Sequence, residues 1–392
     1  MSNGLSADVL FAYVGIITTA TLSVYAGSLG SLPSKDHERR ADEGEEEEEA
    51  DSLPRLTAAD AWLFPLLGSA LLLGLFLVIK YVGKEWINWF MSMYFAFTGL
   101  YSVPHSFVRL VASTVGTQRW SQFRSHRVKV TSGTSQILSF SFRTPAVFLA
   151  ALGVIPSVSY VSYFGPKKPL LLTNVLALSF AHEAMSMLKV DSFRTGTILL
   201  SGLFFYDVWW VFGTKVMVSV ATSLDLPMKI LWPKSTTFST ENGSMMLGLG
   251  DIVVPGTFVS SALRYDHFRH TAKEARPAGT TTTTTTTRST FAKPYFVASL
   301  VAYVAGLAVT MTVMHVFRAA QPALLYLSPA CVLSFVFTAW RRGELIEAWR
   351  WSDGEDGAKT ASKNGSAVDN KAKASSDSAG GATSDPSDAV SS

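Results

Sequence analysis

Long apolar runs alternate with short polar segments along most of the chain. A helix needs about 20 mostly apolar residues to cross a bilayer, and about nine runs have a suitable length. They cover residues 9–31, 61–79, 86–103, 145–164, 169–188, 195–220, 245–263, 294–317 and 322–340. The pattern predicts an all-α, polytopic membrane protein with about nine transmembrane helices. Composition agrees, since 48% of the residues are hydrophobic and only 16% are charged.

The first apolar run, 9–31, has two interpretations. An N-terminal apolar run is either a cleaved signal peptide or a retained span, and a signal peptide begins with a basic segment. Here no lysine or arginine precedes Lys35, while Asp8 is acidic. The run is also long for the apolar part of a signal peptide, so we favour a retained span.

Lysine and arginine concentrate in alternate loops, which indicates the orientation. Residues 35–55, 109–143, 189–194, 264–288 and 341–350 carry most of them, and the intervening loops carry few. Cytosolic loops are the basic ones in membrane proteins. We therefore expect the N-terminus in the lumen and the C-terminus in the cytosol.

Three polar segments are expected to lie outside the packed helices. The acidic run 45–49 repels itself, the tract 280–287 is all threonine, and the C-terminal tail has few large apolar residues. We divide the chain into a first span (1–32), an acidic disordered cytosolic loop (33–59), an N-terminal helix bundle (60–164), a membrane core (165–342) and a disordered cytosolic tail (343–392). Whether the sequon at Asn242 is glycosylated stays open, because it lies beside a span.

Two acidic residues fall inside predicted spans. Asp207 lies in 195–220, and Asp251 lies about 9 Å along a helix that we expect to begin at Met245. One aspartate at the centre of a membrane helix costs roughly 2.5–3.5 kcal/mol. No lysine or arginine lies at a matching depth in either span, so neither acid is half of an ion pair there. Consecutive antiparallel helices can bring the two carboxyl groups together.

Two carboxyl groups in one dry site hold a single proton between them, because both cannot be ionised. That state suits peptide hydrolysis: the ionised member activates water, and the protonated member donates to the carbonyl oxygen. Gly248 and Gly250 leave room for another backbone beside Asp251, although small residues also serve ordinary helix packing. Pro322 lacks an N–H and suits the start of a helix.

Three short motifs together resemble the intramembrane aspartyl proteases, and most closely the signal peptide peptidase family, to which the presenilins are related. They are Tyr206-Asp207, Gly248-Leu249-Gly250-Asp251 and Pro322-Ala323-Leu324, and the resemblance is strong from about 168 to 342. It implies a presenilin-like fold with Asp207 and Asp251 as the catalytic dyad. Tyr206, Gly248, Gly250, Pro322, Ala323 and Leu324 would then shape the active site.

The same resemblance implies the setting of the reaction. Substrates would be transmembrane helical peptides, namely remnant signal peptides and type II membrane proteins, cut inside the endoplasmic reticulum membrane. Membrane lipid and a second copy of the chain are the other expected partners; no cofactor, metal or nucleic acid is expected. The tail lacks the dilysine signal that members of this family often carry.

Other functions remain open on the residues alone. Paired intramembrane acids also relay protons in transporters, and an inactive scaffold could bind membrane helices. His182-Glu183 begins like a zinc-protease motif, but position 186 is serine, so we read the pair as interior polar residues. Asn174 is expected to form an interhelical hydrogen bond, and the single cysteine, Cys331, excludes an intrachain disulfide.

Overall fold

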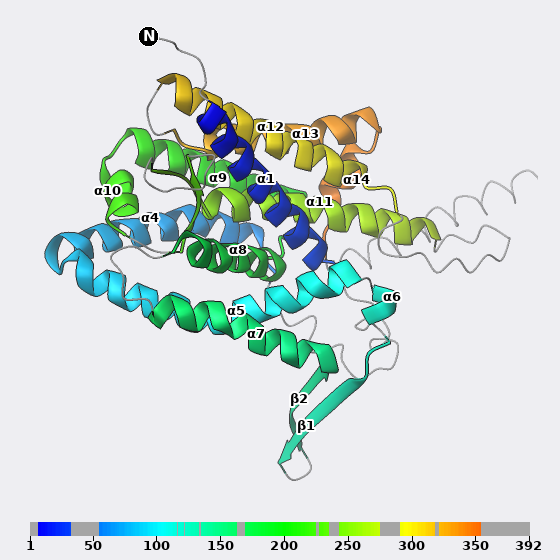
Figure 1. The fold of residues 1–392 in the computed structure, drawn as a ribbon. Helices are drawn as coiled ribbons and strands as arrows, with labels where there is room; N and C mark the ends of the chain where they lie inside the picture. The colour runs from blue at the N-terminus through cyan, green and yellow to red at the C-terminus, as the bar shows by residue number, and fades with distance from the viewer. Residues whose placement is uncertain are drawn as a thin grey trace, which may run out of the picture.

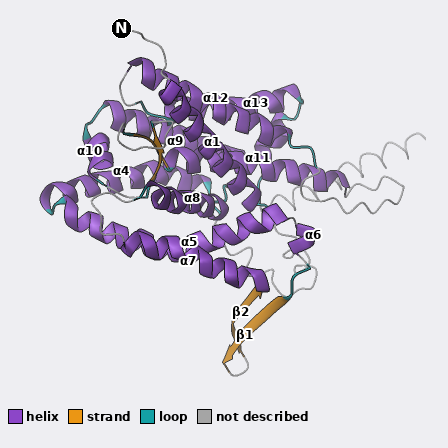
Figure 2. Cartoon of the chain, viewed as in Figure 1, coloured by secondary structure: helices purple, strands orange, loops and turns teal. Residues whose placement is uncertain are grey.

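The computed structural model describes residues 7–32, 55–115, 117–120, 122–132, 135–162, 169–224, 227–234, 243–274, 291–317 and 321–353. Helices dominate it (Figures 1 and 2). The helices are α1 (Ala7–Gly30), α4 (Ala58–Tyr81), α5 (Lys84–Val115), α6 (Thr117–Trp120), α7 (Thr144–Ser162), α8 (Leu170–Met187), α9 (Phe193–Phe212), α10 (Val216–Ser223), α11 (Gly250–Glu274), α12 (Pro294–Phe317), α13 (Leu324–Arg341) and α14 (Leu345–Arg350). The strands are β1 (Ser125–Ser132), β2 (Ser135–Arg143), β3 (Lys229–Pro233) and β4 (Ser244–Gly248).

The expectation of a helical, polytopic membrane protein is confirmed. Within the described residues, 6 helices are long and apolar enough to cross a membrane, namely α1, α4, α8, α9, α12 and α13. Every one of the predicted spans overlaps a helix, with α5, α7 and α11 accounting for the remaining three. A total of nine spans stays a prediction.

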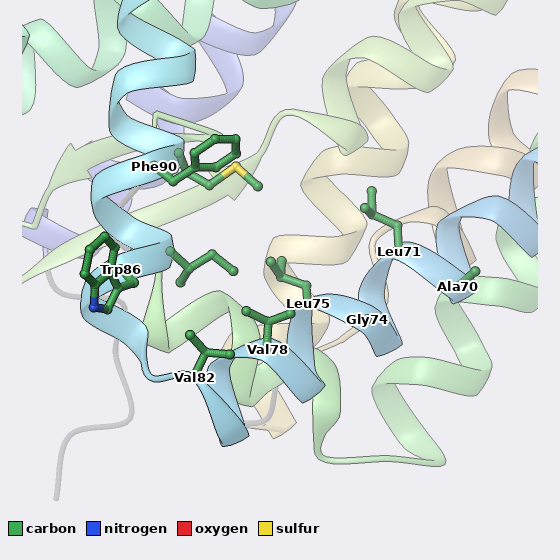
Figure 3. A pocket seen from close by; sticks show the side chains of 10 residues that line it. Ala70, Leu71, Gly74, Leu75, Val78, Val82, Trp86 and Phe90 are labelled. Carbon is green, nitrogen blue, oxygen red and sulfur yellow. The ribbon is translucent and has the colours of Figure 1, made fainter.

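The paired helices α4 and α5 present mainly apolar side chains to the outside. Leu66 is 67% exposed and Leu71 is 71% exposed, which suits contact with lipid rather than water. The turn between the helices contains Gly83 at φ 101°, a left-handed conformation that favours glycine. Between the two helices lies an open hollow of about 490 Å³, lined almost wholly by apolar side chains including Trp86 and Phe90 (Figure 3).

Close packing of small residues holds α1 against α8 and α11. Met185 of α8 fills the space beside two glycines: a Cβ on Gly27 would lie 2.4 Å from its Cε, and a Cβ on Gly256 would lie 2.5 Å from its Sδ. A hydrogen bond from Ser260 to Ser28, 3.0 Å long, joins α11 to α1 at the same interface. Small residues at such contacts are typical of membrane helices. Lipid tails are as apolar as the side chains, so helices associate mainly through close packing and not through the hydrophobic effect.

Two antiparallel hairpins were not predicted. β1 and β2 project away from the helices below α5 and α7 (Figure 1), in the stretch between the predicted spans 86–103 and 145–164 of the N-terminal helix bundle. β3 and β4 pair with each other just before α11. The prediction that a helix begins at Met245 is therefore wrong, because residues 244–248 form β4 and α11 begins at Gly250.

The prediction of a disordered tail from residue 343 is also wrong at its start. α14 lies there, and Trp351 packs with its ring 5.5 Å from Phe193 and 5.3 Å from Tyr265. An aromatic cluster buries this segment against α9 and α11, which supplies the apolar contact that an isolated tail lacks. The acidic run 45–49, the threonine tract 280–287, Asn242 and the tail from 354 lie outside the described residues.

Asp353 ties this C-terminal segment to the ends of the core helices. Its carboxylate accepts from Arg264 Nε at 2.6 Å, its backbone N–H donates to Asp191 O at 2.6 Å, and Arg55 donates to its carbonyl oxygen. Arg264 also donates to Val190 O at 2.8 Å. One buried guanidinium thus joins α11 to the residues that lead into α9 and to the segment after α14.

Candidate active site

Asp207 lies on α9 with a side chain that is almost fully buried, at 4% exposure. Its Oδ2 accepts a hydrogen bond of 3.1 Å from the backbone N–H of Leu324, the first residue of α13. The first N–H groups of a helix have no partner within it, and no side chain caps α13 at Ala323. Asp207 therefore caps α13 from a neighbouring helix, where the helix dipole favours a negative charge.

Asp251 is the second residue of α11 and directly follows the hairpin. Leu249 continues from β4: its N–H donates to Met228 O at 2.9 Å, and its carbonyl accepts from Val253 N at 2.8 Å. Hairpin and helix thus share one continuous hydrogen-bonded turn. This places Asp251 at the junction of the two, partly exposed, rather than about 9 Å along a helix that begins at Met245.

The two carboxyl groups lie close enough for the charge of Asp207 to act on Asp251. The hydrogen bond between Arg264 and Val190 O joins α11 to the start of α9, and it fixes how far along each helix the two acids lie from a common point. Asp251 lies about 20 Å from Arg264 along α11, and Asp207 lies about 21 Å from Phe193 along α9. Because the two helices run in opposite directions and meet at this joint, the two acids come level with each other.

The residues predicted to shape the site differ in how close they lie to the two aspartates. A Cβ on Gly248 would lie 3.4 Å from Asp251 Oδ2, so this glycine borders the carboxylate, whereas a Cβ on Gly250 would meet nothing within 4 Å. The phenol ring of Tyr206 lies toward Gly68 of α4, whose added Cβ would be 3.5 Å from its Cε2. Tyr206 thus flanks Asp207 on the α4 side.

The segment Pro322-Ala323-Leu324 forms the start of α13. Leu324 supplies the N–H to Asp207, and the side chains of Ala323 and Leu324 are 7% and 6% exposed. Pro322 accepts from Leu325 N at 3.2 Å through its carbonyl, which begins the first turn. The proline opens the helix at a point where it needs no N–H of its own.

The hairpin has one edge closed by a side chain and one edge without a partner. Asn174 of α8 donates to Leu231 O at 2.7 Å and accepts from Leu231 N at 2.8 Å, so it occupies the outer edge of β3. Leu231 lies opposite Met246 in the hairpin. Because the N–H and C=O of Leu231 point outward, this is one of the pairs that form no hydrogen bonds across the two strands. The N–H and C=O of Met246 therefore also point outward, and no residue of the described part pairs with them.

The prediction of an interhelical hydrogen bond for Asn174 is wrong, because its side chain bonds to the main chain of β3 instead. Sequence reasoning also missed a contact from α12. Tyr303, with 0% exposure, donates from its hydroxyl to the main-chain carbonyl of Asp251 at 3.4 Å. Nothing in the apolar span around Tyr303 marks this residue as functional. Pro255 is the sequence feature that indicates a missing donor, because it lies four residues after Asp251 and has no N–H to give to the Asp251 carbonyl.

Of the expected interior polar pair of α8, His182 and Glu183, Glu183 forms a separate contact with α5. Glu183 lies 2.7 Å from Nδ1 of His105 on α5, and Glu183 is 9% exposed. These residues join α5 to α8. Among the residues that the structure describes, no three His, Cys, Asp or Glu side chains are grouped as metal ligands would be.

Comparison with known proteins gives a consistent result. The sequence model of the signal peptide peptidase family matches residues 45–355. The chain is 32% identical to the signal peptide peptidase of Homo sapiens over 367 residues, which covers 91% of this chain and 88% of the human protein. It is 32% identical to a probable intramembrane protease of Schizosaccharomyces pombe, covering 76% of this chain and 85% of the relative.

A shorter match with higher identity is to intramembrane protease 2 of Caenorhabditis elegans, which is 42% identical over 195 residues, or 48% of this chain and 39% of the relative. Both the family model and the human relative span the helices that carry Asp207 and Asp251. The chain belongs to the signal peptide peptidase family of intramembrane aspartic proteases.

Proposed function

We propose that Asp207 and Asp251 are the catalytic dyad of this protease and cut transmembrane helical substrates, including remnant signal peptides and type II membrane proteins. The observation that carries the proposal is the junction of α9, α11 and α13. One oxygen of Asp207 is held by Leu324 N at 3.1 Å, and Asp251 stands at the start of α11, where an added Cβ on Gly248 would lie 3.4 Å from its Oδ2. The other oxygen of Asp207 is left to accept a proton from water.

The reaction follows from a single proton shared by two carboxyl groups. The ionised carboxylate takes a proton from water as the water attacks the peptide carbonyl, and the protonated carboxyl donates to the carbonyl oxygen. The tetrahedral intermediate then expels the amine, which takes the proton that the first carboxylate received from water. One hydroxyl of the intermediate returns its proton to the second carboxylate, and the dyad regains its starting state. The site is in the endoplasmic reticulum membrane in this proposal, with the N-terminus lumenal and the C-terminus cytosolic; assembly with a second copy stays a prediction.

Isotope labelling tests this mechanism directly. Purified protein in detergent, given a transmembrane peptide in water enriched in oxygen-18, is expected to place one labelled oxygen in each new carboxyl group. Hydroxylamine is expected to trap no acyl-enzyme, because water itself is the nucleophile. Mass spectrometry of the products reads both outcomes. Hydroxamate products would contradict the mechanism, and absence of any cleavage would reopen the transporter and scaffold alternatives.

A helical substrate must unwind before its carbonyl can be attacked, because a helix uses that carbonyl in its own hydrogen bonds. Unpaired backbone in lipid is costly, so the enzyme must supply partners. The outward N–H and C=O of Met246 lie on β4, only a few residues before Asp251. We expect the unwound substrate to add a strand along this edge, as extended peptides do at other exposed sheet edges.

Substrates with single amide-to-ester replacements test the strand. An ester removes one N–H and leaves the side chains unchanged. Because only every second residue of a strand faces a given neighbour, we expect cleavage to slow by roughly three- to tenfold at alternate positions near the scissile bond, and to be unaffected at the positions between them. Rates would be measured by product mass at fixed substrate concentration. Equal effects at neighbouring positions would rule out pairing along β4.

A further inference from the structure

A proline leaves the backbone of Asp251 without its normal support. In an α-helix the carbonyl of residue 251 accepts from the N–H of residue 255, and residue 255 is Pro255 inside α11. Proline has no N–H, and its ring also pushes away the carbonyl four residues earlier. The Asp251 carbonyl is therefore released from the helical ladder at the start of α11, where the preceding Gly250 gives the chain little stiffness of its own.

Tyr303 of α12 occupies the position of the missing donor. Its hydroxyl lies 3.4 Å from the Asp251 carbonyl oxygen, and its side chain is 0% exposed within the main core cluster. No other hydrogen bond is made by this hydroxyl within the described residues. The separation is long for an O–H···O bond, and bonds in unliganded active sites often tighten when substrate binds.

We propose that Tyr303 is a positioning residue for the protease reaction, holding the backbone of Asp251 in place of the bond that Pro255 removes. The proposal rests on Asp251 being a member of the dyad. The direction of the Asp251 carboxyl follows from the orientation of its backbone, and α11 alone does not hold that orientation. A third helix, α12, thereby takes part in aligning two carboxyl groups carried by α9 and α11. The residue acts through Asp251 and contacts no reacting atom.

Tyr303→Phe tests the proposal by removing one oxygen and keeping the ring. We expect kcat to fall by roughly tenfold with KM unchanged, because substrate binding does not depend on this bond. In the Pro255→Ala background residue 255 has an N–H again, so the same Tyr303→Phe change is expected to alter kcat by less than about twofold. Both pairs of variants are measured with one transmembrane peptide in detergent.

The matched control is Tyr295→Phe. Tyr295 lies on the same helix with 0% exposure, and its hydroxyl donates to Glu344 at 3.2 Å, away from the dyad. This variant loses an equivalent buried hydroxyl, so it is expected to keep kcat within about twofold of wild type. Comparing Tyr295→Phe with Tyr303→Phe distinguishes the effect of losing any buried tyrosine hydroxyl from the effect of losing the hydroxyl beside Asp251.

Three results would overturn the inference. They are an unchanged kcat in Tyr303→Phe, a fall of equal size in Tyr295→Phe, and a tenfold fall that persists in the Pro255→Ala background. If Pro255→Ala does not fold, the kcat and KM of Tyr303→Phe against Tyr295→Phe still decide the matter. Wild-type cleavage in the same assay tests the proposed function separately. The thermal midpoint of each variant tests the hydrogen bond itself: Tyr303→Phe should lower it in the wild-type background and change it less in the Pro255→Ala background.

Discussion

Replacing either Asp207 or Asp251 by asparagine is expected to lower kcat by about four orders of magnitude. In the proposed mechanism each carboxyl group transfers a proton, which an amide cannot do. Asparagine is the right substitution, because its side-chain oxygen can still accept from Leu324 N at position 207 and the shape of the site is kept. The measurement is the rate of cleavage of a transmembrane peptide by purified, folded protein.

The double variant is expected to be no slower than either single variant, since the two groups act as a unit. Asp266→Asn is the control on the same helix as Asp251. Asp266 is 3% exposed and accepts from Phe296 N at 2.9 Å, a bond that asparagine can also accept. It should retain cleavage. If Asp207→Asn or Asp251→Asn kept more than about a hundredth of the wild-type kcat, that residue would have no acid-base role.

Asp353→Ala is expected to destabilise the protein by about 3 kcal/mol, more than Arg264→Met does. The two substitutions differ because each leaves the charge of the other residue without its partner. The side chain of Arg264 is 5% exposed, whereas that of Asp353 is 25% exposed. Removing Asp353 strands a guanidinium in the core, while removing Arg264 leaves a carboxylate that water can reach. Arg264→Met should cost about 1 kcal/mol, mainly for its hydrogen bond to Val190 O.

Unfolding by a denaturing detergent, followed by near-ultraviolet circular dichroism, gives the two stabilities. The variant that combines both changes is the control, because removing Arg264 as well removes the stranded charge. Its stability should return close to that of Arg264→Met. An equal loss in both single variants would mean that Arg264 is hydrated in the protein and that the bond to Asp353 is an ordinary surface pair.

The apolar pattern determined the helical spans well, because a run of about 20 apolar residues has few alternatives to a membrane helix. It also determined the two acids, since Asp207 and Asp251 lie in spans with no basic residue at their depth. The free-energy cost of an aspartate in lipid is enough to make both residues functional candidates. These inferences need only local information, namely hydrophobicity, length and charge.

Residues 244–248 show where local information ends. A short apolar stretch reads equally well as a helix start or as a strand. The structure makes it β4, because β3 offers a ladder and Asn174 closes the outer edge of that ladder. The partners lie far apart in the sequence, so no periodicity within β4 could have chosen between the two. The order of α14 likewise depends on contacts of Trp351 with residues far away in the sequence.

The inferences about the proposed dyad also came partly from the sequence and partly from the structure. The sequence determined which residues carry carboxyl groups and that Pro255 removes a donor four residues after Asp251. Only the tertiary structure decided that Leu324 N–H meets Asp207, that Arg264 brings the two helices level, and that Tyr303 reaches the Asp251 carbonyl. Each of these is a contact between helices, and the free energy of such contacts depends on packing geometry that the order of residues along one helix does not contain.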